Sequence, residues 1–228
     1  MEQEMEKSFA VIFDIDGTMV NNTAFHKSAW LGLLRTRYDK NLSEREYHEK
    51  IHARSNDRIV RNLFGEDTPV ETIQKIADEK ELLYRTTFAP HLREIPGLTR
   101  LLSELEQLNI ACGTVSNSPK ENVDFVLDGL NLRRFFKIAI NRDMVKVGKP
   151  DPESLLRTAN ELGYLPARCL VFDDSASGFR ACRNAGMKYI AITAATDPVD
   201  LAETYDAIAV LPDFTSLSVQ MLAKLMMG

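Results

Sequence analysis

Six short apolar runs, rich in β-branched and aromatic residues, recur along the 228-residue chain and limit its possible folds more than any other feature. They cover Phe9 to Phe13, Ile110 to Val115, Phe136 to Ile140, Cys169 to Phe172, Tyr189 to Ile192 and Ala207 to Val210. Runs of this kind predict strands that are buried on both faces. Helical patterns lie between the later runs, and this alternation predicts an α/β fold with a doubly wound parallel sheet.

Three of these helices have recognisable start signals. The segment Ser118-Pro119-Lys120-Glu121 offers an N-cap serine, a proline at the first helical position and a capping-box glutamate. Asp151-Pro152 and Asp197-Pro198 repeat the first part of that signal. We therefore expect helices to begin at these three points.

Residues 22–91 contain no convincing strand pattern, only amphipathic stretches such as "HKSAWLGLLRTRY" and "ETIQKIADEKELLYRTTF". Capping-box patterns occur at Ser43 with Glu46 and at Thr68 with Glu71. The simplest interpretation is a four-helix insertion after the first strand. We therefore expect a helical cap domain over residues 22–91 and an α/β core over residues 1–21 and 92–228.

Composition describes an ordinary soluble protein, with 44% hydrophobic and 27% charged residues. The formal net charge of −5 gives no overall positive field that would attract nucleic acid or an acidic membrane. The acidic start and the lack of an apolar stretch of about 18 residues favour a cytoplasmic location. Three cysteines cannot all pair and are expected to be buried free thiols. Nothing in the pattern indicates an obligate protein partner.

Two carboxylates follow the first apolar run, in the segment "DIDGT". In open parallel sheets the ligand crevice lies beyond the carboxyl ends of the strands, so Asp14 and Asp16 are expected there. Two carboxylates this close repel unless a cation such as Mg²⁺ or a shared proton relieves them. A turn at Asp-Gly that merely ends the strand is an equally good interpretation of this segment alone.

Other predicted strand ends carry compatible chemistry. Ser116 and the amides around Asn117 could hold an anion, although Ser116 could also serve a turn. Asp173 and Asp174 form a second acidic pair, for which a helix N-cap is the alternative. Lys149 precedes a proline, and a solvated surface lysine is the default there. Together these residues favour a catalytic site over purely structural roles.

In these four segments, "DIDGT", "VSNS", "KVGKP" and "VFDDSASG", the chain resembles the haloacid dehalogenase superfamily of phosphotransferases. It is most similar to the subgroup with a helical cap, which includes β-phosphoglucomutase and small-molecule phosphatases. The segments occur in the family's order and approximate spacing. The resemblance implies a Rossmann-like core with an inserted helical-bundle cap domain.

The resemblance also implies roles for individual residues. Asp14 would be the nucleophile that becomes an aspartyl phosphate, and Asp16 the general acid and base. The implied Mg²⁺ ligands are Asp14, the main-chain carbonyl of Asp16, Asp174 and, directly or in support, Asp173. The implied phosphoryl-binding groups are Ser116, Lys149 and the amides near Gly17 and Asn117.

These roles are chemically coherent. A carboxylate that attacks phosphorus splits one hard displacement into two easier steps, provided that a metal and a lysine counter the phosphoryl charge. A neighbouring protonated carboxyl can then supply the proton of the leaving group. We therefore expect a Mg²⁺-dependent phosphatase that acts on a small phosphorylated metabolite, specifically a sugar phosphate. The alternatives are a β-phosphoglucomutase-type mutase and a catalytically silent binding module.

The predicted cap contains weaker candidates. Residues in the helical cap that resemble substrate-contacting positions of the family are His26, Arg54, Asn56 and Arg58, followed by Lys80 and Arg85. A solvated helix start is the alternative for Arg54, Asn56 and Arg58, and a half-buried structural histidine is the alternative for His26. Asn21 stands where many relatives have an acid, and Asn56 stands where β-phosphoglucomutase has an arginine. Both departures weigh against the mutase.

The segment from His48 to His52 matches the zinc-protease pattern H-E-x-x-H. No convincing third ligand follows, and a helix face rich in Glu, Lys and His is commonplace on protein surfaces. We interpret the match as a coincidence.

Overall fold

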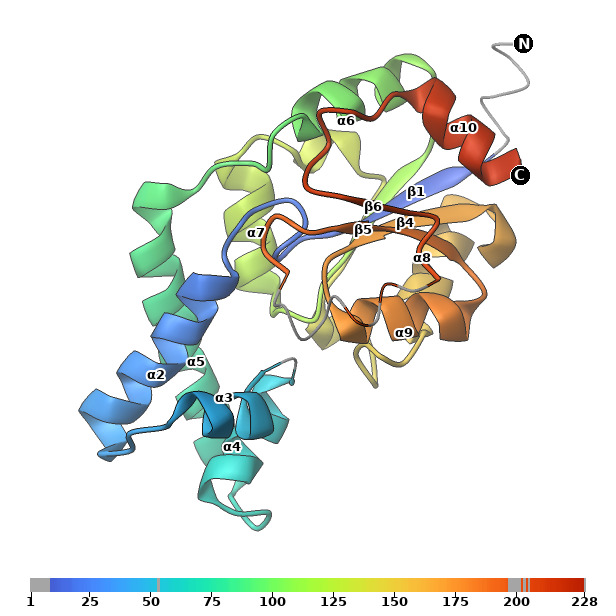
Figure 1. Cartoon of the computed structure of the whole chain (residues 1–228). Coiled ribbons are helices and arrows are strands. Elements are labelled where there is room, and N and C mark those ends of the chain that lie inside the picture. The colour runs from blue at the N-terminus through green and yellow to red at the C-terminus, as the bar shows by residue number, and fades with distance from the viewer. Residues whose placement is uncertain (1–8, 53, 197–201, 203, 205, 228) are drawn as a thin grey trace. The chain divides into compact units, whose positions relative to one another are not determined.

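The computed structural model describes residues 9–52, 54–196, 202, 204 and 206–227. The chain divides into two compact units, which are described separately here (Figure 1). The core unit comprises Met1–Asn21 and Leu92–Gly228, and the helical unit comprises Asn22–His91. Within the described residues, no helix combines the length and the apolar character that a membrane crossing requires.

The core unit is built on a parallel sheet with the strand order β3-β2-β1-β4-β5-β6. Its strands are β1 (Ala10–Asp14), β2 (Cys112–Val115), β3 (Ile138–Ile140), β4 (Cys169–Asp173), β5 (Lys188–Ile192) and β6 (Ala209–Leu211). Every neighbouring pair in this order is parallel. All six predicted strands are confirmed, and so is the doubly wound α/β fold class.

Helices cover both faces of the sheet (Figure 1). The core-unit helices are α6 (Leu98–Gln107), α7 (Lys120–Gly129), α8 (Glu153–Leu162), α9 (Ala176–Ala185) and α10 (Val219–Met227). Short 3₁₀ turns lie at Arg133–Phe135, Arg142–Met144 and Pro166–Arg168. Alternate residues of β1 face opposite sides, because Ile12 belongs to the cluster with α8 and α9, whereas Phe13 stacks on Phe172 at 5.0 Å.

We predicted that all six strands are buried on both faces, and this prediction is wrong for the two edge strands, β3 and β6. The central strands β1 and β4 are buried throughout, but the exposed fraction of Val210 in β6 is 48%. In β3 only Ile140 is fully buried. A strand at the edge of a twisted sheet has a neighbour on one side only, so the flanking helices cover it less completely.

Two of the predicted helix starts differ in detail from the sequence signals. Ser118 does not cap α7; instead, the amide of Lys120 donates to Oδ2 of Asp143 at 2.9 Å. At α8 the N-cap residue is Pro152 rather than Asp151, and the side chain of Asp151 accepts from the amide of Glu153 at 2.9 Å. The predicted start at Asp197-Pro198 lies outside the described residues.

The helical unit contains α2 (Thr23–Tyr38), α3 (Glu44–Lys50), α4 (Asn56–Phe64), α5 (Val70–Phe88) and a 3₁₀ turn at Ala89–His91. This agrees with the expected four helices. Its apolar core joins all four, through residues such as Trp30, Tyr47, Ile59 and Ile76.

The two predicted capping boxes of the helical unit have different outcomes. Ser43 and Glu46 form a complete box at the start of α3. The box at Thr68 is wrong, because the Thr68 hydroxyl donates to the carbonyl of Gly65 at 2.7 Å and makes no cap bond to α5.

The three cysteines are confirmed as buried free thiols: Cys112, Cys169 and Cys182.

Candidate active site

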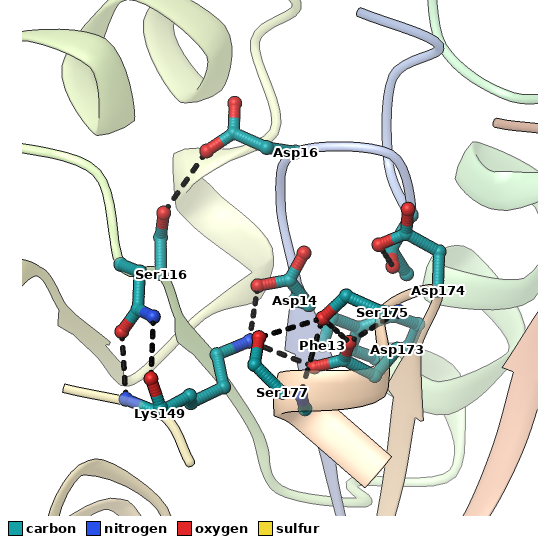
Figure 2. A network of polar contacts seen from close by, with 12 residues as sticks. Phe13, Asp14, Asp16, Ser116, Lys149, Asp173, Asp174, Ser175 and Ser177 are labelled. Atoms are coloured by element: carbon teal, nitrogen blue, oxygen red, sulfur yellow. Dashed lines mark hydrogen bonds and ion pairs between the residues drawn. The ribbon is translucent and has the colours of Figure 1, made fainter. Parts of the chain in front are cut away.

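The register of the sheet brings the predicted catalytic residues together. Asp14 pairs with Val115 of β2, and Phe13 pairs with Phe172 of β4. Ser116 and Asp173 therefore emerge beside Asp14 at the carboxyl edge of the sheet (Figure 2). The three strand ends meet because β1 lies between β2 and β4.

Lys149 is a buried ion-pair partner, so the interpretation as a solvated lysine is wrong. Its side chain is 3% exposed, and its Nζ lies 2.5 Å from Oδ1 of Asp14 and 2.7 Å from Oδ2 of Asp173. The side chain of Asn117 holds the lysine backbone from both sides, accepting from the Lys149 amide at 2.8 Å and donating to its carbonyl at 3.0 Å. The loop after β2 thus positions the lysine at the end of β1.

Asp173 is fixed by the start of α9. Its Oδ1 accepts from the amide and the hydroxyl of Ser175, at 3.0 and 2.9 Å. A Cβ at Gly178 would lie 2.0 Å from the Asp173 carboxylate, so the close approach of this helix requires glycine. Ser175, rather than either aspartate, is the N-cap of α9. The interpretation of the acidic pair as a helix cap is therefore wrong.

Asp174 lies close to Asp14 and against the turn that follows β1. A ligand oxygen from each of Asp14, Asp173 and Asp174 lies within 4.8 Å of the other two, and all three residues are buried. The Thr18 hydroxyl donates to Oδ1 of Asp174 at 3.2 Å. Gly17 has φ +85°, and a Cβ there would meet Oδ2 of Asp174 at 2.0 Å. The turn is therefore built to bring backbone against this carboxylate.

The charges in this cluster do not balance. Burial raises the pKa of Asp14 to about 8; Lys149 opposes that rise, whereas Asp173 and Asp16 add to it. Burial and the charges of Asp14 and Asp173 also hold the pKa of Asp174 well above its usual value. Burial would lower the pKa of Lys149, but Asp14 and Asp173 outweigh it and raise that pKa. Three carboxylates share one lysine, and such a set of hard oxygen donors fits a divalent cation such as Mg²⁺.

Asp16 has a different environment from Asp14. β1 ends at Asp14, and the Gly17 amide donates to the carbonyl of Val20 at 2.9 Å in the turn that follows. The half-buried carboxylate of Asp16 accepts, at its Oδ2, from the hydroxyl of Ser116 at 3.1 Å (Figure 2). The amide of Gly17 is thus engaged in the turn, and its proposed contact with phosphate stays a prediction.

Ser118 is a residue of this site that the sequence interpretation missed. Its hydroxyl donates to Oδ2 of Asp16 at 2.6 Å. The sequence had assigned it to the cap of α7, because Ser-Pro-x-Glu is a common helix start. The spacing offers one signal that could have revealed it: Ser118 is two residues beyond Ser116, so an extended chain would place both hydroxyls on the same side.

A family model described as a haloacid dehalogenase-like hydrolase matches residues 10–186. The chain belongs to this family. The match contains all four motifs and confirms the resemblance that they predict. Membership makes the chain an enzyme of the hydrolase class.

Similar proteins of known name include both phosphatases and mutases. A protein named phosphorylated carbohydrates phosphatase, from Thermotoga maritima, is 28% identical over 79% of this chain and 83% of its own length. β-Phosphoglucomutase from Bacillus subtilis is 29% identical, with 78% and 80% covered. The crystal structure of a family IA haloacid dehalogenase hydrolase from Entamoeba histolytica has a TM-score of 0.87, 26% identity and coverage of 96% and 100%. Its likeness confirms the fold of this haloacid dehalogenase-like hydrolase.

In the helical unit of this hydrolase, several candidates form one polar network. Nζ of Lys80 lies 2.8 Å from Nδ1 of His26 and 2.9 Å from Oε1 of Glu81. The amide of Asn56 donates to the same Glu81 oxygen at 2.7 Å. Glu81 was missed, because a glutamate beside a lysine on an amphipathic helix resembles a solvated face.

The arginine candidates have partners of their own within the helical unit. Arg54 donates to the carbonyls of His48 and His52, at 3.0 and 2.8 Å. Arg58 pairs with Glu66 at 2.9 Å. Arg85 is half-buried in the last turn of α5. In the core unit, the Asn21 amide donates to the carbonyl of Ala194 at 2.9 Å.

The H-E-x-x-H match does not lie on a continuous helix. α3 ends at Lys50, before His52, and the carboxylate of Glu49 pairs with Arg45 at 2.7 Å. The general-base glutamate of a zinc protease would instead face the metal-bound water. Among the described residues, the aspartate cluster around Asp14 is the only group of three or more candidate metal ligands.

Proposed function

We propose that this hydrolase is a Mg²⁺-dependent phosphatase that acts on a small phosphorylated metabolite, specifically a sugar phosphate, through a phosphorylated aspartate. One observation carries the proposal: the buried Asp14 carboxylate lies at the carboxyl edge of the sheet, bonded to Lys149 and adjacent to Asp173 and Asp174. A carboxylate with a fixed cation beside it is suited to attack phosphorus and to tolerate the charge that develops there.

In the first step, an oxygen of Asp14 attacks phosphorus, and the bond from phosphorus to the sugar oxygen breaks. The leaving oxygen takes a proton from the carboxyl group of Asp16. In the second step, the Asp16 carboxylate takes a proton from water, which attacks phosphorus and releases Asp14 and inorganic phosphate. Lys149 offsets the phosphoryl charge in both steps.

The residues present fit a divalent cation. Asp14, Asp173 and Asp174 would hold Mg²⁺, which when bound supplies positive charge against the phosphoryl oxygens. The excess of carboxylates over lysines supports this assignment. The contribution of the main-chain carbonyl of Asp16 stays part of the proposal.

The cap assignment is also part of the proposal. We assign the helical unit, Asn22–His91, to a cap that excludes water and contacts the leaving group. Its polar network of His26, Asn56, Lys80 and Glu81 offers neutral and charged hydrogen-bond groups suited to sugar hydroxyls.

The alternative is a β-phosphoglucomutase-type mutase, which similarity to the Bacillus subtilis enzyme keeps in consideration. A mutase must grip the non-transferring phosphate, which requires a cation in the cap. Asn56 provides a neutral amide bonded to Glu81, and the buried Lys80 is paired with the same glutamate. Arg54 and Arg58 bond to other groups of the helical unit. These contacts favour hydrolysis. The complete set of acidic and basic motifs argues against a silent binding module.

One assay separates these functions. The enzyme is incubated with Mg²⁺, β-glucose 1-phosphate and a trace of glucose 1,6-bisphosphate, and glucose 6-phosphate and free phosphate are measured together. A panel with fructose 1-phosphate and glucose 6-phosphate is measured in parallel. We expect phosphate release from sugar phosphates with negligible isomerisation. Rapid isomerisation with little phosphate release would establish the mutase, and no turnover at all would favour the binding module.

A further inference from the structure

The carboxylate of Asp16 is held by two hydroxyl groups of one loop. Both Ser116 and Ser118, which follow β2, donate to the same oxygen, Oδ2, at 3.1 and 2.6 Å. The bond from Ser118 is the shorter of the two. An oxygen that accepts two hydrogen bonds is a poor place for a proton, so the transferable proton of Asp16 belongs on Oδ1.

The backbone of Ser118 is fixed on both sides of this contact. Its amide donates to Oγ of Ser116 at 2.9 Å, and its carbonyl accepts from the amide of Arg142 at 3.0 Å. The helix that follows does not need the Ser118 hydroxyl, because Asp143 accepts from the Lys120 amide. The hydroxyl is therefore available for Asp16, and the loop holds it there.

Ser116 cannot serve two acceptors at once. Its hydroxyl has one hydrogen, which here is directed to Asp16. If a phosphoryl oxygen takes that hydrogen, the bond from the Ser118 hydroxyl to Oδ2 of Asp16 is kept. The Ser118 hydroxyl then continues to orient Asp16 during proton transfer.

We propose that Ser118 is a positioning residue for Asp16, keeping Oδ2 fixed so that Oδ1 delivers the proton to the leaving oxygen. The inference rests on the proposed function, because it needs Asp16 to be the general acid; it assigns no contact between Ser118 and the substrate. Loss of the Ser118 hydroxyl should therefore slow the reaction of a substrate whose leaving group needs a proton. It should cause no further loss of rate in an enzyme whose residue 16 cannot deliver a proton.

The test measures the first step, release of the leaving group in a single turnover, for two probes. p-Nitrophenyl phosphate has a good leaving group that needs little protonation. The second probe is fructose 1-phosphate or glucose 6-phosphate, whichever wild-type enzyme cleaves faster, and its sugar alkoxide needs a proton. Ser118→Ala should lower the rate of leaving-group release from the sugar phosphate by about 10- to 100-fold, within the usual contribution of general acid catalysis. The rate of release from the aryl phosphate should fall by less than about threefold.

Three controls make the result specific. Ser118→Thr keeps a hydroxyl and should recover most of the rate. Ser103→Ala removes a hydroxyl of the same size from α6, where it donates to the carbonyl of Thr99 at 2.8 Å, and should change neither rate. In an Asp16→Asn background, Ser118→Ala should have almost no further effect on the release or hydrolysis step, because coupled residues are not additive.

The outcomes separate this inference from the proposed function. Equal slowing of both probes by Ser118→Ala, or a full further effect in the Asp16→Asn background, would show that Ser118 binds phosphate or supports the fold and would overturn the inference. An unchanged rate would overturn it as well. Failure of the wild-type enzyme to release phosphate from any probe would overturn the proposed function itself.

Discussion

Asp14 and Asp16 are one residue apart in the chain, yet their carboxylates have different partners. Asp14 is buried and bonded to Lys149, whereas Asp16 is half-buried and bonded to Ser116 and Ser118. The ammonium group of Lys149 opposes the rise that burial causes in the pKa of Asp14, whereas hydroxyl donors orient Asp16 without supplying a full charge. The difference in surroundings supports different roles for the two residues.

Asp14→Asn should abolish turnover while the protein stays folded. An amide cannot form an acyl phosphate, and its shape is close to that of the carboxylate. Activity on p-nitrophenyl phosphate and thermal unfolding are measured side by side. Turnover within about tenfold of the wild type would remove Asp14 as the nucleophile.

Asp174→Ala should raise the Mg²⁺ concentration needed for half-maximal activity by about tenfold or more, because the ion loses one of few protein carboxylates. Asp213→Ala serves as the control, since Asp213 accepts from Thr215 outside the aspartate cluster. An unchanged requirement in the Asp174 variant would mean that the ion binds elsewhere.

Sequence patterns predicted the residues at strand ends and missed those defined by loop conformation. Asp14, Ser116 and Asp173 could be placed together because the carboxyl ends of parallel strands meet at one edge. Ser118 could not, because a serine before proline matches a helix cap and only the loop conformation directs its hydroxyl elsewhere. Glu81 lies on α5 and was missed for a different reason, because a glutamate beside a lysine on an amphipathic helix resembles a solvated face.

At the scale of elements, the strands were predicted correctly and the helix ends less so. An apolar run indicates a strand because the residues of the run are selected together for burial in the sheet. A helix cap depends on a single hydrogen bond, so its sequence signal is weaker. The α7 start illustrates this difference, since its side-chain acceptor, Asp143, is 23 residues away from Lys120 in the chain. A local motif search cannot find such a partner.

Asp143→Ala should lower the free energy of unfolding by about 0.5–2 kcal/mol, the usual cost of losing a helix cap. Ser118→Ala should change it much less, because its hydroxyl makes no cap bond to α7. Urea unfolding of both variants measures the difference. A larger loss of stability in the Ser118 variant would mean that Ser118 supports the fold rather than Asp16.

At the scale of the whole molecule, four motifs spread between residues 14 and 178 build one charged cluster in the core unit. The fold accommodates several buried carboxylates there, and this arrangement makes its stability depend on pH and on a cation. The substrate could not be predicted from the sequence, because under the proposed function it depends on contacts between a ligand and residues of the helical unit.

Without metal, stability should fall as pH rises from about 4 to about 8. Burial raises the pKa of Asp14 from 3.8 to about 8, so in this range the folded protein keeps a proton that the unfolded chain has released. The unfolded state binds fewer protons there, and ΔG of unfolding therefore decreases with pH. Mg²⁺ requires the deprotonated carboxylates, so its stabilising effect should increase over the same range.

Thermal unfolding with EDTA and with Mg²⁺, at about pH 5 and about pH 8, measures this linkage. The difference in Tm between the two conditions should be larger at the higher pH. Asp14→Asn should reduce the pH dependence in EDTA, because it removes one of the groups with a raised pKa. A Mg²⁺ effect that is equal at both pH values would contradict this account of the cluster.

The most direct test of phosphoryl transfer through Asp14 is to identify the phosphorylated residue. Enzyme turning over p-nitrophenyl phosphate with Mg²⁺ is quenched in acid, digested and mapped by mass spectrometry, with Asp14→Asn as the control. We predict one phosphoryl group on the peptide that contains Asp14, assigned to that residue and absent from the variant. Phosphate release by the wild type with the phosphoryl group on another residue would contradict the account.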